Sequence, residues 1–174
     1  MIMIINKKIF LIIFFVFFSM NCFSQIGIGI SSVKGSALID FAENTTNGMI
    51  LPHVNDVDNM LVDTKGTIVF DEKSKKVKYF DGEKWISMNR EEGKLSDSFS
   101  FQEYDVSQGV IIGNEKSDAS GVLILESNDR ALVLPKISDP AKNVTSPYPG
   151  MICYDTVSNN VYFFNGLVWE FWGH

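Results

Sequence analysis

The sequence YFDGEKW occupies residues 79–85, and a close variant, FFNGLVW, occupies residues 163–169. Both stretches read aromatic, aromatic, Asp or Asn, Gly, two variable residues and Trp, and they lie 84 residues apart. Asp-Gly and Asn-Gly favour two-residue type I′ hairpin turns, in which both central residues need a positive φ. We therefore predict two equivalent β-hairpins with these structural turn residues: Asp81, Gly82, Asn165 and Gly166.

Two cross-strand pairs follow from this turn geometry. A two-residue turn places Lys78 opposite Trp85 in the first hairpin, and Tyr162 opposite Trp169 in the second. Cross-strand pairs on one face of a sheet help to fix the register of its strands. We expect a cation–π contact in the first pair and aromatic stacking in the second.

The spacing of 84 residues also relates other segments of the chain. GTIVFD at residues 66–71 recurs as GMICYD at residues 150–155. MILP at residues 49–52 recurs as LVLP at residues 132–135, with a slip of one residue. An internal repeat of this length indicates a duplicated module that gains by stacking or by multivalency.

Two copies of one unit account for most of the chain. They cover residues 26–88 and 110–172, and a polar linker covers residues 89–109. In each copy, β-branched and aromatic runs alternate with turn residues, and Leu-Pro ends an earlier strand because Pro cannot continue a ladder. We predict a mainly β protein with two tandem small β-meander or hairpin units and irregular connections.

The connection that follows Leu-Pro differs between the copies. In the first copy, the sequence HVNDVDNMLVDTK is compatible with a short helix that turns Val54, Val57 and Leu61 inward. In the second copy, prolines argue against a helix, because Pro breaks a helix interior. These prolines are Pro140, Pro147 and Pro149.

The second hairpin is rich in aromatic residues, with six among the eleven residues from Tyr162 to Trp172. These side chains alternate between both faces of one small sheet, and a sheet with two apolar faces must be covered on both sides. The N-terminal half of the unit can cover one face, and the sister unit, another subunit or a ligand can cover the other. The candidate surface for a ligand or partner comprises Trp85, Tyr162, Phe164, Trp169, Phe171 and Trp172.

The N-terminus has the pattern of a secretory signal peptide. Two lysines precede an unbroken apolar run over residues 9–18, which is too short to span a bilayer and is followed by more polar residues. We predict a signal peptide over residues 1–24 and an exported protein in the periplasm, on the outer-membrane surface or outside the cell. The alternative is a lipoprotein acylated at Cys22, although Asn21 stands where a lipobox has a small residue.

The charge of the chain excludes some classes of partner. The net charge of −6 becomes −8 once residues 1–24 and their two lysines are removed. Such an acidic chain is poorly suited to bind nucleic acid or anionic membranes, which attract clustered Lys and Arg. Cys153 is then the single remaining cysteine, so the mature chain cannot form an intramolecular disulfide.

The repeated unit resembles a repeat of secreted and tail-fibre-like surface proteins of Bacteroidota. That repeat combines Gly-apolar-apolar-Leu-Pro-Arg, Gly-apolar-apolar-apolar-Tyr-Asp-Thr and aromatic-aromatic-Asn-Gly-x-x-Trp. The chain has GMILPH, GTIVFDE and YFDGEKW, and then ALVLPK, GMICYDT and FFNGLVW, so that His53 and Lys136 replace the usual Arg. The resemblance implies an extracytoplasmic β-rich module, often within fibrous and trimeric assemblies, without catalytic activity.

The sequence contains no recognisable catalytic constellation. Its two histidines, His53 and His174, are not accompanied by a Gly-x-Ser-x-Gly elbow. Ser31 and Lys34 fit Ser-x-x-Lys, but the Ser-Asp-Asn and Lys-Thr-Gly partners are missing. Cys153 aligns with a valine of the first copy, which favours a small core side chain. We predict that the protein is not an enzyme and has no cofactor.

Two short patterns have an alternative interpretation as binding or modification sites. Asp56, Asp58 and Asp63 could offer oxygen ligands to Ca²⁺, but their spacing does not fit an EF-hand. A solvated acidic loop without a metal is therefore favoured. The sequence Asp155-Thr156-Val157 resembles the O-glycosylation signal used by Bacteroidota, whereas its Asp also ends a predicted strand.

These observations favour a non-catalytic structural or adhesive module of the cell envelope. We expect self-association through the aromatic second hairpin, because leaving several aromatic rings in water is costly for so small a unit. The trimeric state is implied by the resemblance alone. The alternative is a carbohydrate-binding module with exposed Trp and Tyr platforms, and the partner would then be a surface glycan rather than an envelope protein or a second copy.

Overall fold

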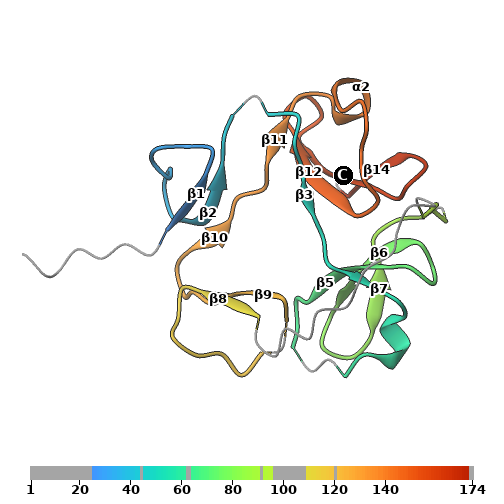
Figure 1. Ribbon diagram of the computed structural model, residues 1–174, viewed down its shortest axis with the longest axis horizontal. Helices are drawn as coiled ribbons and strands as arrows, with labels where there is room; N and C mark the ends of the chain where they lie inside the picture. Colours follow the sequence, from blue (N-terminus) through green and yellow to red (C-terminus); the bar gives the residue numbers. More distant parts are fainter. Residues whose placement is uncertain are drawn as a thin grey trace, which may run out of the picture.

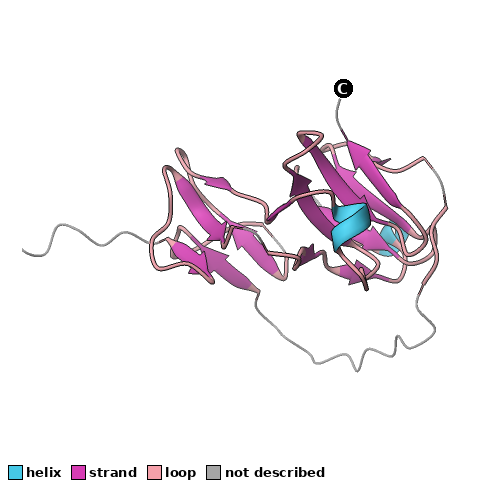
Figure 2. Ribbon diagram, turned by 90° about the horizontal axis from the view of Figure 1, so that it is seen from above, coloured by secondary structure: helices cyan, strands magenta, loops and turns pink. Residues whose placement is uncertain are grey.

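The computed structural model describes residues 25–43, 45–61, 64–90, 92–95, 109–119 and 121–172. The predicted signal peptide, and Cys22 with it, lies outside these residues. Short strands joined by turns make up most of the described chain, and helix is confined there to two short segments (Figure 2). The prediction of a mainly β fold is therefore confirmed.

The elements of the first copy recur in the same order in the second copy (Figure 1). The first copy contains β1 (Ile26–Ile28), β2 (Ala37–Phe41), β3 (Met49–Ile50), β4 (His53–Val54), the 3-10 helix η1 (Val57–Asn59), β5 (Ile68–Asp71), β6 (Lys76–Phe80) and β7 (Trp85–Ser87). The second copy contains β8 (Val110–Ile112), β9 (Leu123–Leu125), β10 (Ala131–Leu132), β11 (Lys136–Ile137), α2 (Pro140–Asn143), β12 (Met151–Asp155), β13 (Asn160–Phe164) and β14 (Trp169–Trp172).

The repeat extends to the backbone conformation of single residues. Four positions with positive φ in the first copy are matched by positions 84 residues later that also have positive φ. The φ angles are 82° and 78° at Gly66 and Gly150, and 54° and 58° at Lys75 and Asn159. Non-Gly residues adopt this region only at defined turns, so the same turns are built twice.

The described residues form four small sheets. Two meanders have the orders β4-β5-β6-β7 and β11-β12-β13-β14, each with a parallel first pair followed by antiparallel pairs. The other two sheets, β1-β2-β10 and β8-β9, are entirely parallel. Figure 1 shows β1, β2, β8 and β9 gathered at one end of the molecule and the two meanders at the other end.

The two copies are tandem in sequence but exchange strands in space. Strand β10 of the second copy pairs in parallel with β2 of the first, and β3 of the first copy pairs antiparallel with β12 of the second. The N–H of Leu51 also donates to the carbonyl of Gly150, at 3.0 Å. Each copy therefore completes a sheet of the other.

The main hydrophobic core is shared between the copies. Leu51, Phe70 and Val77 from the first copy pack with Ile152 and Phe163 from the second, and all five residues are buried. A second cluster lies on the opposite face of the second meander, and a third joins β2 to β8. The second cluster comprises Ile137, Val144, Met151 and Cys153. No helix formed by the described residues has the length and apolar character needed to span a bilayer.

The predicted two-residue hairpin turns are wrong, because each loop holds four residues. The pairs next to the loops are Phe80 with Trp85 and Phe164 with Trp169, so Lys78 and Tyr162 do not lie directly opposite the tryptophans. Lys78 instead pairs with Asp71, with Nζ 2.6 Å from Oδ2.

The longer loop is stabilised by the side chain of its first residue. Oδ1 of Asp81 accepts hydrogen bonds from the N–H groups of the third and fourth loop residues, both at 2.8 Å, and Oδ1 of Asn165 accepts the equivalent pair at 2.9 Å. These bonds satisfy amides that would otherwise lack partners, which favours the four-residue loop. Within these two loops, the glycines Gly82 and Gly166 are the residues with positive φ.

The predictions for the connection after Leu-Pro are also partly wrong. In the first copy, η1 buries Val57, but Leu61 is 100% exposed rather than inward. In the second copy, the helix α2 forms despite the prolines, with Pro140 at its first position. Proline is well tolerated there because the first helical N–H needs no intrahelical acceptor and the ring fixes a helical φ.

Candidate assembly surface

The strands β13 and β14 direct alternate side chains to opposite faces of their sheet, as expected for a pleated strand. Phe163 enters the shared core and is fully buried. Tyr162, Phe164 and Trp169 face the other way and pack against the cluster around Cys153. The chain's own residues therefore cover most of both faces of the hairpin.

Four rings on the outer face form a connected row. The centroids of Phe164 and Trp169 are 5.5 Å apart, those of Trp169 and Tyr162 are 6.4 Å apart, and those of Tyr162 and Phe171 are 5.7 Å apart. Such offset or tilted ring pairs stabilise a structure beyond their burial. Trp169 is half-buried between its two neighbours, so this ring contributes to the stability of the hairpin.

Apolar side chains remain exposed along β14 and in the loop before it. Phe171 and Trp172 are 55% and 62% exposed, and Leu167 and Val168 at the loop are also exposed. We call these four residues the aromatic edge. They lie on and beside β14, which is the last strand of its sheet, and an edge strand can pair with another chain.

The first copy lacks an equivalent surface. Trp85 is half-buried and packs on Phe80, with ring centroids 5.5 Å apart. The positions that correspond to Phe171 and Trp172 hold Ser87 and Met88. Trp85 belongs to the other meander, β4-β5-β6-β7, whereas the aromatic edge lies at β14, and a role of Trp85 in a ligand or partner surface stays a prediction.

Part of the expected linker belongs to the fold. The N–H of Lys94 donates to the carbonyl of Asn165 at 2.9 Å, and Leu95 packs against the shared core. The N–H of Arg90 donates to Oε2 of Glu170 at 2.8 Å. Asn165 is completely buried, and these contacts fix the loop end of the second hairpin. The polar composition of this segment gave no signal for its packing.

Comparison with protein families agrees with these observations. The family model described as a phage tail like trimerisation region matches residues 27–101 and 111–173. The chain belongs to this family. The tail-fibre-like part of the resemblance is thereby confirmed, whereas secretion and an origin in Bacteroidota stay predictions. The family match is interrupted between the two copies. No curated protein and no solved structure matches the chain.

The acidic loop of this trimerisation region is paired with a lysine. Nζ of Lys73 lies 2.6 Å from Oδ2 of Asp56 and 3.2 Å from Oδ2 of Asp58. The hydrogen bond from Lys73 holds the pKa of the Asp56 carboxyl below its usual range. Asp63 lies outside the described residues, within which no cluster of His, Cys, Asp and Glu side chains could hold a metal ion.

His53 joins the two copies of the trimerisation region. Its Nε2 lies 2.9 Å from the carbonyl oxygen of Pro149, and its Nδ1 lies 3.3 Å from Oε1 of Glu72. Its ring packs between Phe70 and Tyr148, with centroid distances of 4.7 and 5.7 Å. This histidine therefore has a structural role at the junction, and His174 lies outside the described residues.

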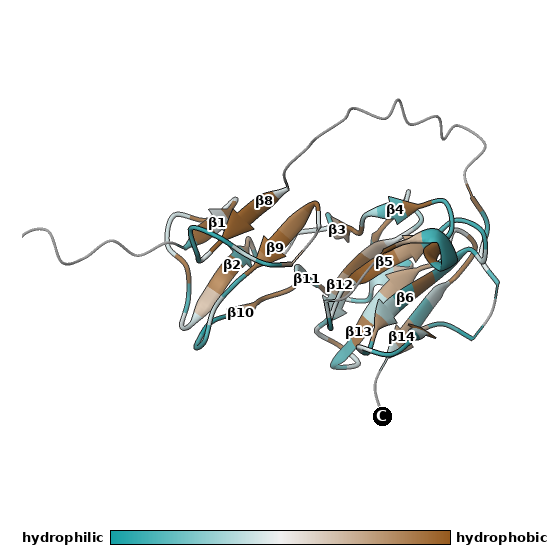
Figure 3. Cartoon of the chain, turned by 90° about the horizontal axis from the view of Figure 1, so that it is seen from below, coloured by the Kyte–Doolittle hydropathy of each residue, from teal (hydrophilic) through white to brown (hydrophobic). Residues whose placement is uncertain are grey.

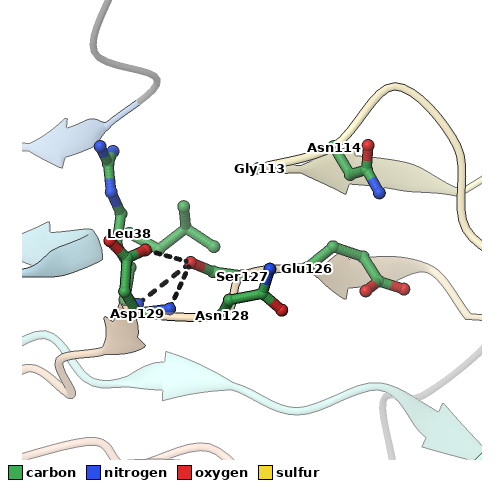
Figure 4. A pocket seen from close by; sticks show the side chains of 8 residues that line it. Leu38, Gly113, Asn114, Glu126, Ser127, Asn128 and Asp129 are labelled. Carbon is green, nitrogen blue, oxygen red and sulfur yellow. Dashed lines mark hydrogen bonds between the residues drawn. The ribbon is translucent and has the colours of Figure 1, made fainter.

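A polar hollow lies near β8 and β9 (Figure 4). Ser127 stands at its centre, where Oγ donates to Oδ1 of Asp129 at 3.1 Å and accepts the N–H groups of Asp129 and Arg130 at 3.3 and 3.0 Å. These bonds hold a turn, and the described residues that line the hollow include no histidine or cysteine. Burial raises the pKa of the Cys153 thiol to about 12, so it is unreactive.

Each meander contains a buried carboxylate at the end of a strand, Asp71 in the first copy and Asp155 in the second. The hydrogen bonds of Asp155 show how such a carboxylate stabilises the fold. Its two oxygens accept the N–H groups of Asp139, Val157 and Ser158 at 2.9, 3.0 and 3.0 Å. Burial opposes the charged form, but a hydrogen bond from the Ser158 hydroxyl, together with these N–H groups, outweighs it and lowers the pKa of Asp155. Asp155 ends β12 and fixes the turn that leads into β13 and the aromatic edge.

We predict that Asp155→Asn lowers the free energy of unfolding at neutral pH by about 1–3 kcal/mol, because one buried N–H loses its acceptor. A carboxyl with a lowered folded-state pKa stabilises the fold above its unfolded pKa of about 3.9, and this contribution is lost as the pH falls through the folded-state value. The difference from wild type should therefore shrink in acid. Urea titrations at several pH values measure it, with the exposed Glu115→Gln as the control, and a pH-independent difference would contradict the assignment.

Proposed function

We propose that the chain is an exported structural module that assembles with copies of itself as a trimer, and that the aromatic edge is part of the contact between chains. One observation carries the proposal. Phe171 and Trp172 are more than half exposed on an edge strand, although the other aromatic rings of the same hairpin are packed within the chain. The description of the family as a trimerisation region supports the number of chains.

The energetics favour burial of this surface by another chain. A large apolar side chain contributes on the order of 2 kcal/mol when it leaves water. The aromatic edge offers four exposed apolar side chains along a single hairpin, two in its loop and two on β14. Large exposed apolar patches are typical of protein–protein contacts rather than of monomer surfaces.

The cellular setting is part of the same proposal. The basic residues and apolar run at the N-terminus support export, and the repeat resembles that of surface proteins. The module would then work in the periplasm, on the outer-membrane surface or outside the cell. A role in adhesion fits such a module, because a trimer presents the same surfaces three times and gains affinity by multivalency.

A carbohydrate-binding module is the second candidate, favoured by the exposed ring of Trp172. Sugar platforms need flat and accessible aromatic rings. Trp85 and Trp169 are half-buried against neighbouring rings. A sugar platform would therefore have to rest on Phe171 and Trp172, the same residues that the assembly would cover.

The mass of the protein in solution tests the assembly. We predict that residues 25–174 sediment and scatter light as a trimer, and that Phe171→Ser combined with Trp172→Ser shifts the mass toward monomer. The control is Leu61→Ser combined with Val157→Ser, which removes two exposed apolar side chains away from the aromatic edge. Far-UV circular dichroism verifies that both variants fold. A wild-type monomer at tens of micromolar contradicts the proposal, and quenching of tryptophan fluorescence by oligosaccharides would favour the second candidate.

A further inference from the structure

The junction between the two copies is asymmetric. From the first copy it uses Phe70 and Val77, which face each other across β5 and β6. From the second copy it uses Ile152 and Phe163, which face each other across β12 and β13. None of the four is more than 4% exposed. The pair from one copy is thus covered by the pair from the other.

The repeat gives each of these residues a counterpart 84 residues away, and the counterparts form two further cross-strand pairs. Tyr154 and Val161 correspond to the pair of the first copy, and Ile68 and Tyr79 correspond to the pair of the second copy. All four are half-buried, although Ile68 and Val161 reach the rim of the shared core. The chain therefore completes one junction and leaves the two halves of a second one partly open.

Trp172 extends the open half on the second copy. It faces Val161 across β13 and β14. The corresponding residue of the first copy is Met88, whose N–H donates to the carbonyl of Val77 and whose side chain packs against the shared core. We call Tyr154, Val161 and Trp172 the donor face, and Ile68 and Tyr79 the acceptor face.

Two equivalent glycines show the same contrast between a filled and an open junction. A Cβ on Gly150 would lie 3.1 Å from Nε2 of His53 and 3.1 Å from Cβ of Phe70, so the first copy packs directly against this backbone. A Cβ on Gly66 would meet no described heavy atom within 4 Å. The two glycines have nearly the same φ, so the difference lies in what covers them.

The two parallel sheets show the same contrast between a filled and an open junction. Strand β2 lies between β1 and β10, whereas its counterpart β9 pairs with β8 alone among the described strands. The counterpart of β10 is β3. Figure 3 shows β8 and β9 as strongly apolar, and Val110 and Leu123 are exposed on them. A third strand from a first copy would complete this sheet as β10 completes the other.

We propose that neighbouring chains join head to tail by repeating, between chains, the junction that joins the two copies within a chain. The donor face of one chain packs on the acceptor face of the next, and β3 of that next chain adds to β9. The inference rests on the self-association proposed above and identifies the surface that receives Trp172. A contact between two different surfaces of identical chains closes into a ring when the rotation allows it.

The main alternative is a symmetric contact in which the aromatic edges of two chains meet each other. Such a contact needs Trp172 but makes no use of Ile68 and Tyr79. The acceptor face therefore distinguishes the two arrangements.

A complementation experiment tests the proposal with two full-length mature variants. Trp172→Glu damages the donor face, and Tyr79→Glu damages the acceptor face. We expect each variant alone to self-associate at least tenfold more weakly than the wild type. An equal mixture should form a heterodimer and nothing larger, because the intact donor face of one variant meets the intact acceptor face of the other and each remaining face is damaged. Sedimentation velocity with one variant fluorescently labelled measures the complex.

The controls separate the failure of this inference from the failure of self-association. Leu61→Glu adds the same charge at a fully exposed site and should assemble as the wild type does. Melting curves verify the fold, and Tyr79→Ser replaces Tyr79→Glu if the charged variant does not fold. If the folded Tyr79 variant assembles like the wild type, or if the mixture stays monomeric, the head-to-tail contact is wrong while self-association stands. A monomeric wild type overturns self-association itself.

Discussion

Replacing Phe163 with alanine is expected to lower the free energy of unfolding by about 3–5 kcal/mol, the range for removing a buried aromatic ring from a core. Phe163 is fully buried, and it packs against Phe70 and Val77 of the other copy. The cavity therefore opens between the copies, and both should lose stability together. Urea unfolding followed by circular dichroism and by tryptophan fluorescence measures the effect.

The matched control is Phe171→Ala, which removes the same ring from an exposed position on the neighbouring strand. At concentrations where the chain is monomeric, we expect Phe171→Ala to change the free energy of unfolding by about 1 kcal/mol or less. The variant loses one stacked ring contact, which is the one with Tyr162. Two separate unfolding transitions for Phe163→Ala, with the first copy unaffected, would contradict the shared core.

Replacing Gly166 with alanine is expected to lower the free energy of unfolding by about 2–4 kcal/mol. The left-handed backbone disfavours a Cβ, and the added Cβ would also displace the segment around Lys94. The φ of Gly166 is +96°, and a Cβ there would collide with the main-chain carbonyl of Lys94. A backbone contact of this kind cannot move aside without breaking the hydrogen bond between Lys94 and Asn165.

Gly82→Ala supplies the control for this prediction. Gly82 occupies the same turn with a φ of +101°, but the nearest atoms to its Cβ would belong to the flexible side chain of Lys65. We expect Gly82→Ala to lower the free energy of unfolding by about 1–2 kcal/mol, because the backbone conformation alone disfavours the added Cβ. Thermal melts of both variants should rank Gly166→Ala as the less stable protein, and equal losses would show that the segment around Lys94 adds nothing.

The sequence predicted those features that depend on local chemistry. The glycines at residues 82 and 166 and the Asp or Asn before them located both hairpin loops, because a positive φ and a side-chain acceptor are needed there whatever lies around them. The register was missed because a two-residue and a four-residue loop use the same dipeptide. The hydrogen bonds that Asp81 accepts from the N–H groups of the third and fourth loop residues favour the four-residue loop.

The exchange of strands could not be predicted from either copy alone. Met49 pairs with Ile152 of the second copy, yet Ile68 of its own copy occupies the equivalent place and offers similar chemistry. Whether Met49 pairs with Ile152 or with Ile68 depends on the path of the whole chain. For the same reason, the alternation of side chains along the two strands assigned the aromatic residues to two faces but did not predict which rings stay exposed. Trp169 is covered by its neighbouring rings and the cluster beneath them, whereas Trp172 is not.

The exchanged strands constrain how the two copies can diverge in evolution. Independent tandem repeats drift apart freely, since each repeat needs to match only itself. Here Ile152 must fit Phe70 and Leu51, and β3 must fit β12, so we expect a substitution in one copy to require compensation in the other. Aligned natural variants should therefore show covariation between residues of different copies that occupy different repeat positions. Loss of a single copy would leave its former partner without both a strand and half of a core.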